Sequence, residues 1–275
     1  MIRPYRPQIC EVEPRSTPAP GTPLPRPPLP HRGAPWALFL DVDGSLLEFA
    51  ASPSGVRVPP ALIGLLQRLR DALDGALALV SGRGIDDLDR LFAPLRLPAA
   101  GVHGCELRAA DGARRALELD RALAARLHAR ARELAAALPG VRLEPKPAAV
   151  ALHYRHAPAL AAQVHEGAAR IAAALPGIAL QPGAMVCELK PAGADKGRAV
   201  EALRAAPPFR DRTPVFVGDD LTDEHAFAAV NRADGLSVLV GARPSAARYA
   251  LPAPADVHAW LRRVAAALEQ GGSGP

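Results

Sequence analysis

The sequence predicts an α/β fold in which a parallel sheet carries helices on both faces and a smaller α+β unit is inserted. Short, wholly apolar runs alternate with segments of helical periodicity towards both ends of the 275-residue chain. Such runs are typical of parallel strands that are buried on both faces. The middle of the chain has hairpin signals and amphipathic helices instead, which indicates a separate inserted unit.

The composition is that of a globular protein of one or two domains. Hydrophobic residues make up 49% of the chain and charged residues 22%, which suffices for a sizeable core. No run of about 18 apolar residues occurs, so we expect no membrane partner. The N-terminus lacks the apolar stretch of a signal peptide, and the three cysteines have no CxxC spacing. We therefore expect a cytoplasmic protein, and we take it to be a monomer.

The net charge of +5 and the sequence pI of about 9.5 admit nucleic-acid binding as one interpretation. The arginines are scattered, however, and only 4% of the residues are aromatic. No basic run alternates with stacking residues. We therefore expect no nucleic-acid partner.

Residues 1–33 hold ten of the 30 prolines and have almost no apolar periodicity. This composition predicts a disordered, polyproline-like leader, with a role as a ligand for a proline-binding domain as the alternative. After it, the first strand is Trp36–Leu40. A helix with leucines at helical spacing (59–73), a second buried strand (75–80) and a third strand with a turn (97–106) follow.

The middle of the chain predicts a hairpin through Asp111-Gly112, then an amphipathic helix with Asp120 as its cap. The next elements are a strand-turn-strand, a helix and two strands, at 141–155, 158–174, 177–183 and 184–190. The last part returns to buried strands and helices, at 195–206, 214–220, from Asp223 onward, 236–241 and 256–269. This predicts a division into the leader (1–33), a core (34–107 and 185–270) and an inserted unit (108–184).

Polar side chains follow three of the predicted parallel strands. The first strand ends in Asp41 and Asp43, the second in Ser81, and a late strand in Asp219 and Asp220. In open α/β sheets the carboxyl ends of the strands line the ligand site. We therefore expect these groups to meet at one edge of the sheet.

Carboxylates crowded in this way repel one another and need a cation. Aspartate oxygens without His or Cys nearby favour a hard ion, so Mg²⁺ is the expected cofactor. Mg²⁺ usually completes its coordination with a substrate phosphate, for which Ser81 and Lys196 offer donors. The pattern predicts phosphate-ester hydrolysis, with Asp41 as the nucleophile and Asp43 as the acid and base.

Lysine is rare in this chain. Of the 33 basic residues only Lys146, Lys190 and Lys196 are lysines. An ammonium group is a point charge and a guanidinium a planar fork, so the two do not substitute freely at a tight site. Each lysine is therefore a candidate site residue, although chance explains any single one of them.

Each short motif is weak on its own, because a lone DxD is often a solvated acid pair and DKG alone is a helix cap. Their order along the chain makes coincidence improbable. Through DVDGS, SGR, DKG and GDDLTDE the sequence resembles the haloacid-dehalogenase superfamily of phosphatases. Through LEPKPAAVALHYRHAP and ELKPAGADKG it resembles the trehalose-6-phosphate phosphatases of bacteria.

The resemblance implies a Rossmann-like parallel-sheet core with an inserted cap, and Mg²⁺-dependent hydrolysis of a phosphorylated disaccharide, trehalose 6-phosphate. It makes Asp41 the nucleophile and a metal ligand. Asp43 becomes the acid and base and gives its backbone carbonyl to the metal. Asp219 becomes a further metal ligand, supported by Asp220 and Asp223.

Other roles also come from the resemblance. Ser81 and Lys196 are expected to hold the phosphate, and Arg83 and His103 to orient the substrate or close the cap. Ser45 stands where the family more often has threonine, so the hydroxyl is kept and a methyl group is lost. The cap residues implied to face the sugar are Glu144, Lys146, Arg155, Glu188 and Lys190.

Several alternatives stay open at this point. His153 and Tyr154 either approach the sugar or pack inward as part of a cap strand. A related capped phosphatase acting on sucrose phosphate or a mannosyl phosphate has the same core motifs, so only the cap separates these substrates. A non-catalytic module that docks a partner through the leader is disfavoured, because the chain keeps Asp41, Lys196 and Asp219.

Overall fold

The computed structural model describes residues 24–31, 33–48, 57–146, 149–183 and 185–269. Its larger sheet has eight strands, in the order β12-β11-β10-β1-β2-β3-β4-β5. The first six of that order are parallel, and β4 and β5 add an antiparallel hairpin at one edge. The strands are β1 (Trp36–Leu40), β2 (Leu77–Val80), β3 (Ala99–Gly101), β4 (Glu106–Arg108), β5 (Arg114–Ala116), β10 (Thr213–Gly218), β11 (Leu236–Val240) and β12 (Tyr249–Leu251).

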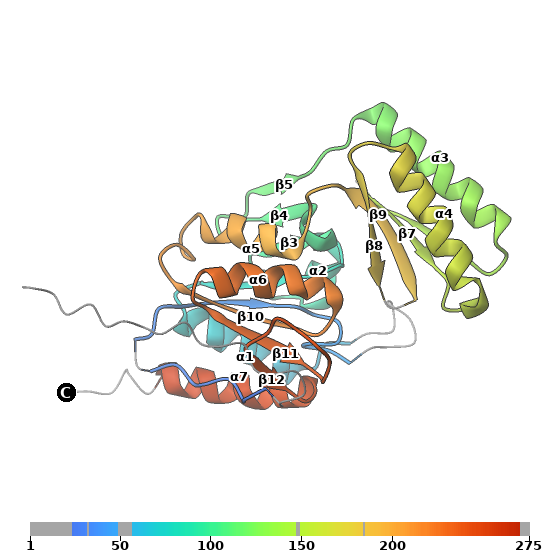
Figure 1. Ribbon diagram of the computed structural model, residues 1–275. Coiled ribbons are helices and arrows are strands. Elements are labelled where there is room, and N and C mark those ends of the chain that lie inside the picture. Colours follow the sequence, from blue (N-terminus) through green and yellow to red (C-terminus); the bar gives the residue numbers. More distant parts are fainter. Residues whose placement is uncertain (1–23, 32, 49–56, 147–148, 184, 270–275) are drawn as a thin grey trace, which may run out of the picture.

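Helices cover both faces of this sheet, as the apolar strands predict. On one face α1 lies beside α7, and on the other α5 lies beside α6 (Figure 1). Every residue of β1 and β2 is buried. The aromatic core includes Phe39, whose ring stacks on that of Phe209 with centroids 5.3 Å apart. The core helices are α1 (Pro60–Ala72), α2 (Ile85–Leu91), α5 (Lys196–Arg204), α6 (Glu224–Arg232) and α7 (Pro254–Glu269).

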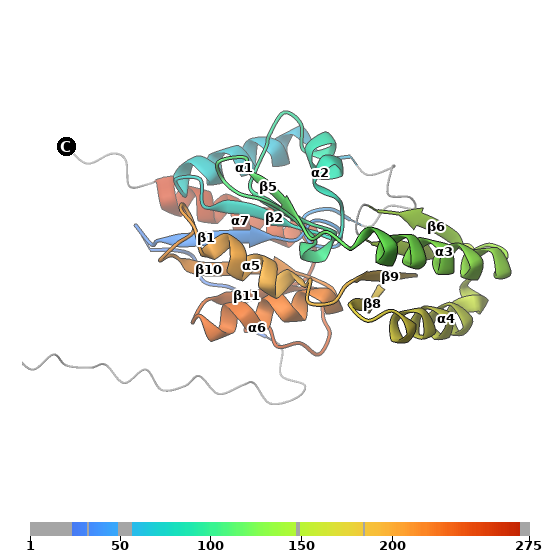
Figure 2. The ribbon, with the colours of Figure 1, turned by 90° about the horizontal axis from the view of Figure 1, so that it is seen from above.

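A second unit, which we call the cap, stands beside the carboxyl edge of the large sheet (Figures 1 and 2). Its antiparallel sheet has the order β6-β7-β9-β8, with α3 and α4 on one face. Leu152, Cys187 and Leu189 pack against these helices, so the alternate residues of the strands face away from them. The cap elements are α3 (Arg121–Ala137), β6 (Arg142–Pro145), β7 (Val150–His153), α4 (Ala161–Ala174), β8 (Ile178–Gly183) and β9 (Val186–Pro191).

The sheets divide the chain differently from the predicted boundaries. The hairpin β4–β5 belongs to the large sheet, although the predicted inserted unit begins at 108, and β9 belongs to the cap, although the predicted core resumes at 185. The predicted boundaries rest on local patterns, whereas sheet membership depends on long-range pairing. The short strand β12 and the helix α2 were not predicted from the sequence.

The leader also differs from its prediction. Residues 24–31 are ordered against the core, where Leu24 and Leu29 pack on the apolar cluster. Residues 1–23 of the predicted leader lie outside the described residues. The prolines in 24–31 lower chain entropy without forbidding a fixed conformation, so composition alone did not reveal the contact.

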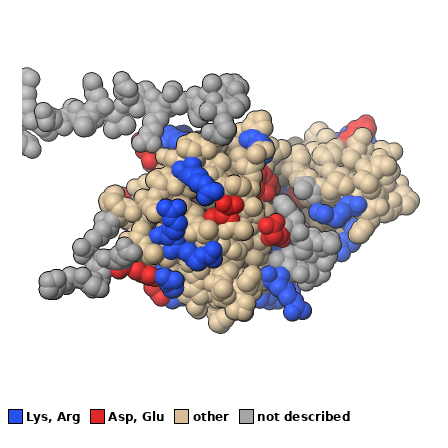
Figure 3. Space-filling view, turned by 90° about the horizontal axis from the view of Figure 1, so that it is seen from below, with Lys and Arg blue, Asp and Glu red and all other residues tan. Residues whose placement is uncertain are grey.

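Two further features of the described chain concern its surface. None of its helices is both long and apolar enough to cross a membrane. On the face seen in Figure 3, basic side chains form several groups with acidic and uncharged surface between them. The net positive charge is therefore not gathered into one patch on this face.

Candidate active site

A buried ion pair joins the end of β1 to the start of α5. Lys196 Nζ donates hydrogen bonds to Asp41 Oδ1 (2.8 Å) and to Asp223 Oδ1 (2.7 Å). All three residues are almost completely buried. Asp41 follows β1 directly, and Lys196 is the first residue of α5. The fold thus brings together polar groups that lie 155 residues apart in sequence.

Two further acids complete this acid cluster. Asp223 Oδ2 accepts hydrogen bonds from the backbone N–H groups of Asp219 (2.8 Å) and Asp220 (3.0 Å). Asp220 Oδ1 lies 3.9 Å from Lys196 Nζ. One carboxylate oxygen from each of Asp41, Asp219 and Asp223 lies within 4.8 Å of the others, close enough to share one cation.

The acid cluster has more negative than positive charge, and the pKa values reflect this. Burial raises the pKa of Asp41 to about 8, with Lys196 opposing the rise and Asp219 adding to it. Burial and repulsion from Asp223 and Asp220 raise the pKa of Asp219 to about 6. Burial opposes the ionisation of Asp220, but Lys196 lowers its pKa to about 2. A bound cation would relieve this repulsion.

The loop after Asp41 lets Asp219 approach closely. Ser45 Oγ lies 3.0 Å from Asp41 Oδ2 and 3.0 Å from Asp219 Oδ1, so its hydroxyl lies between the two carboxylates. Gly44 has φ +87°, and a Cβ there would lie only 2.2 Å from Asp219 Oδ2. Only glycine fits both the backbone conformation and the space.

Asp43 has different partners from Asp41, although a single residue separates them. Arg83 forms a bidentate ion pair with Asp43, through Nε to Oδ2 (2.6 Å) and Nη2 to Oδ1 (2.7 Å). Arg83 Nη1 also donates to Asp87 Oδ2 (2.9 Å). The structure therefore places Arg83, expected to orient the substrate or close the cap, on the second acid. Asp87 was missed, because nothing in the SGR motif indicates how the guanidinium reaches its partners.

The loops after β2 and β3 pack tightly together. Ser81 is 1% exposed, and its Oγ accepts a hydrogen bond from the backbone N–H of Arg83 (3.1 Å). Val102 and His103 have φ of +48° and +52°, a strained conformation for residues other than glycine. The His103 ring lies against Gly82, where a Cβ would be 2.7 Å from Nε2.

The cap contacts these loops through Lys146 and Glu188. Lys146 Nζ donates to the carbonyl oxygen of Gly82 (3.2 Å) and forms an ion pair with Glu188. His103 Nε2 lies 3.0 Å from Glu188 Oε2, although the two atoms lack the alignment of a hydrogen bond. Burial opposes the ionisation of Glu188, but His103 and Lys146 hold its pKa below the ordinary value. Cap and core therefore meet directly above the SGR loop.

A row of polar side chains crosses the cap sheet on the face away from α3 and α4. We call it the polar row, and its members are Glu144, Glu188 and Gln181. The strand register pairs Glu144 with Ala151, Ala151 with Glu188, and Glu188 with Gln181. The small Ala151 leaves space between the two glutamates. Gln181 was not predicted, because the sequence does not show which strand residues stand opposite one another.

The remaining cap residues divide between the two faces of the sheet. Glu144 Oε2 lies 2.7 Å from His153 Nε2. Tyr154 is buried on the helix side, with its hydroxyl 3.0 Å from His165 Nε2. Tyr154 thus packs inward, whereas His153 pairs with a residue of the polar row. Arg155 is exposed just beyond the end of β7.

Lys190 lies at the connection between cap and core. It is 3% exposed, and its Nζ donates to the carbonyl oxygen of Ala194 (2.6 Å). Asp195 then caps α5 by accepting a hydrogen bond from the backbone N–H of Arg198 (2.8 Å). Both contacts fix the segment that leads from the cap to Lys196.

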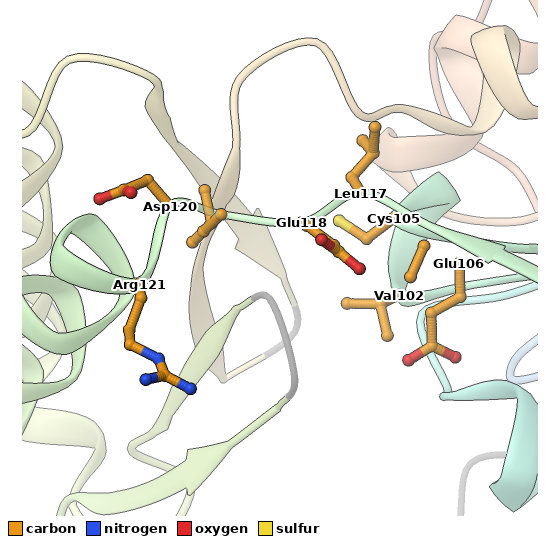
Figure 4. Close-up of a pocket in the computed structure, with 9 residues that line it drawn as sticks. Val102, Cys105, Glu106, Leu117, Glu118, Asp120 and Arg121 are labelled. Carbon is orange, nitrogen blue, oxygen red and sulfur yellow. The ribbon is translucent and has the colours of Figure 1, made fainter.

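A hollow follows the other connection, residues 117–120, between the core and the start of α3 (Figure 4). Val102, Cys105 and Glu106 line it from the core, and Glu118 and Arg121 from the connection and α3. No residue of the acid cluster lines this hollow. It therefore belongs to the junction of the two units.

Comparisons with known proteins agree over most of the chain. A profile of the trehalose-phosphatase family matches residues 39–255. A trehalose-6-phosphate phosphatase of Escherichia coli (strain K12) is 44% identical over 241 residues, 88% of this chain and 91% of that protein. A probable trehalose-phosphate phosphatase of Sinorhizobium fredii is 45% identical over 234 residues, 85% of this chain and 87% of that protein.

Solved structures share the fold at lower identity. The C-terminal domain of a Candida albicans trehalose-6-phosphate phosphatase has a TM-score of 0.73 at 20% identity, covering 84% of this chain and 92% of that one. A phosphatase of the haloalkanoate (HAD) superfamily from Bacteroides thetaiotaomicron has a TM-score of 0.60 at 17% identity, covering 89% and 98%. The predicted fold class, a parallel-sheet α/β core with an inserted smaller α+β unit, is therefore confirmed.

The close approach at Gly44 predicts a stability difference between two glycine variants. Gly112 also has a left-handed φ (+85°), but a Cβ there meets nothing within 4 Å. Gly112→Ala should lower the free energy of unfolding by about 1–2 kcal/mol, through backbone strain alone. Gly44→Ala should lower it by roughly 2–5 kcal/mol, because overpacking against Asp219 is added. Equal losses in denaturant titrations would show that Asp219 is not held against Gly44.

Proposed function

The chain belongs to the trehalose-phosphatase family, and we propose that it hydrolyses trehalose 6-phosphate to trehalose and phosphate. The observation that carries the proposal is the buried Asp41 at the end of β1, held by Lys196 and Ser45. The family match includes this residue and the whole acid cluster. Its relatives of 44–45% identity are named for this activity.

The reaction proceeds in two steps on this chain's own residues. A carboxylate oxygen of Asp41 attacks phosphorus, the bond from phosphorus to the sugar oxygen breaks, and Asp43 gives a proton to that oxygen. Trehalose leaves and an aspartyl-phosphate remains. Asp43 then takes a proton from water, which attacks phosphorus, releases phosphate and restores Asp41. Ser81 and Lys196 donate hydrogen bonds to the phosphoryl oxygens in both steps.

Arg83 is a positioning residue in this scheme. It holds both oxygens of Asp43, at 2.6 and 2.7 Å, and so fixes the direction of that carboxyl group. Asp43 must release at least one of these contacts before it exchanges a proton with the substrate. The fork geometry of the guanidinium suits this task better than a lysine would.

The acid cluster fits Mg²⁺. Asp41, Asp219 and Asp223 offer only carboxylate oxygens, which suit a hard divalent ion, and the backbone carbonyl of Asp43 is a further candidate ligand. Burial, and after it repulsion from neighbouring acids, raises the pKa of Asp41 and of Asp219, and a cation bound there would favour their ionised forms. When bound there, Mg²⁺ would offset the negative charge of the phosphoryl oxygens.

The cap supplies the recognition of the sugar in this proposal. The polar row of the cap sheet and its neighbour offer four polar side chains, those of Glu144, Lys146, Gln181 and Glu188. Carboxylates accept, ammonium groups donate, and amides do both, so the row matches a substrate rich in hydroxyl groups. A sucrose phosphate or a mannosyl phosphate remains the alternative substrate, because the core chemistry is the same.

A panel of phosphosugars tests the substrate and the metal together. With Mg²⁺ present, kcat/KM for phosphate release should be highest for trehalose 6-phosphate, because the cap contacts stabilise its transition state. Chelation with EDTA should abolish the activity, and added Mg²⁺ should restore it. A higher kcat/KM for sucrose 6-phosphate or a mannose phosphate would contradict the substrate. Full activity in EDTA would contradict the metal.

Asp41→Asn tests the nucleophile. The amide is nearly the same size but is not a competent nucleophile, so kcat should fall roughly 10⁴-fold or more, with an unchanged circular dichroism spectrum. Asp86→Asn, at an exposed residue paired with Arg114, is the control and should keep its activity. Substantial turnover by Asp41→Asn would rule out the covalent step.

Glu188→Gln tests recognition by the cap. Removing the charge that faces Lys146 should raise KM for trehalose 6-phosphate roughly 10- to 100-fold, the worth of a hydrogen bond to a charged group. KM for p-nitrophenyl phosphate, which lacks the sugar, should change little. Glu166→Gln, on the exposed side of α4 and paired with Arg170, is the matched control. Equal changes for both substrates would argue against sugar binding at Glu188.

A further inference from the structure

A proline-rich segment of the leader binds to the opposite side of the core from the cap. We call residues 24–30 (LPRPPLP) the strap; it is the dark-blue trace that passes α7 and β12 in Figure 1. The backbone N–H of Ala250 in β12 donates to the carbonyl oxygen of Pro25 (3.0 Å). The indole Nε1 of Trp260 in α7 donates to the carbonyl oxygen of Pro28 (3.1 Å).

The strap contacts the core with a period of three residues. Pro27 and Pro30 are buried and Leu24 is half-buried, whereas Pro25 and Pro28 are exposed. The half-buried Leu29 also packs on the core, beside Pro30. The two carbonyl groups that accept hydrogen bonds, at Pro25 and Pro28, are also three residues apart. Three residues per turn is the repeat of a polyproline II helix. One side of such a helix therefore faces the core.

The surface under the strap has the properties that such a ligand needs. Proline has no backbone N–H, so the receptor must supply the donors, here the Ala250 amide and the Trp260 indole. Trp36 and Trp260 lie with their ring centroids 6.3 Å apart, so the indole that donates to Pro28 belongs to an aromatic pair. Asp256 of α7 pairs with Arg26 (3.1 Å), which adds a polar contact on the exposed side of the strap. Aromatic-lined grooves bind polyproline segments in this way.

We propose that β12 and α7 form a polyproline-recognition groove whose ligand is this chain's own residues 24–30. The connection from Pro30 to Trp36 is short, so the strap has an effective concentration in the millimolar range at the groove. By binding there it also covers β12, which is the edge strand of the large sheet. Exposed edge strands invite pairing with other chains, so the strap protects the sheet from self-association.

Two full-length variants with equal composition test the proposal. Pro27→Asp/Pro30→Asp places charges on the buried side of the strap and should displace it. Pro25→Asp/Pro28→Asp removes the same number of prolines and adds the same charge at exposed positions. The melting temperature of the first variant should lie at least about 4 °C below that of the second. Equal melting temperatures would overturn the proposal.

Peptide binding then identifies the groove. A synthetic peptide of residues 22–32 should bind the Pro27→Asp/Pro30→Asp variant, detected by fluorescence of the two tryptophans, and should not bind the unsubstituted chain, whose groove is occupied. A scrambled peptide of the same composition should not bind. No binding to the variant up to roughly 1 mM peptide, near the effective concentration of the tethered strap, would overturn the proposal.

The unsubstituted chain provides an independent measurement, which remains decisive if a variant does not fold. The indole N–H of Trp260 should exchange with solvent more slowly than a free indole, because it is bonded to Pro28. Exchange as fast as that of free tryptophan would show that the strap does not occupy the groove.

Discussion

The balance of charge at the carboxyl edge of the large sheet is the constraint on which the rest of the site depends. Three carboxylates, those of Asp41, Asp220 and Asp223, lie around the ammonium group of Lys196, and a fourth, that of Asp219, lies close to Asp41 and Asp223. Lys196, Asp41 and Asp223 are almost completely buried. Burial and mutual repulsion raise the pKa of Asp41 and of Asp219, so the chain alone does not neutralise the cluster. Glycines allow the acidic side chains to lie close to the backbone, since a Cβ at Gly218 would lie 2.3 Å from the carboxyl carbon of Asp223. The surplus of negative charge is what makes a divalent cation and a phosphate ester a fitting pair of ligands.

The cap also contains a buried carboxylate, which different residues stabilise. Its buried Glu188 has no solvent to stabilise its charge and is instead held by Lys146 and approached by His103 from the core. These contacts connect cap and core without substrate, and in the proposed function a sugar that enters replaces them with its hydroxyl groups. Recognition therefore depends on an exchange of partners, so the net affinity is the difference between the two sets of contacts. In the proposed function, the same residues connect the cap to the core and bind the substrate.

Much of this arrangement follows from the sequence, because parallel strands bring their carboxyl ends to one edge. Asp41 and Asp219 each follow a recognisable strand, and Lys196 begins a recognisable helix. Side-chain partners are less accessible: the pair of Arg83 with Asp43 depends on the path of a loop, and Gln181 depends on strand register. The prediction that the strap is disordered was wrong for another reason. Proline-rich composition is typical of disorder, but the contact with Trp260 is a tertiary interaction between segments 232 residues apart, which no local pattern reveals.

Trapping the covalent intermediate tests the central claim most directly. Borohydride reduces an acyl phosphate to an alcohol, so quenching the enzyme with it during turnover of trehalose 6-phosphate should convert Asp41 to homoserine. Peptide mass spectrometry locates the modified residue. The account predicts the modification at Asp41 alone, dependent on substrate and Mg²⁺. Modification of Asp43 or Asp219 instead, or no modification at any time point of the burst phase, would contradict it.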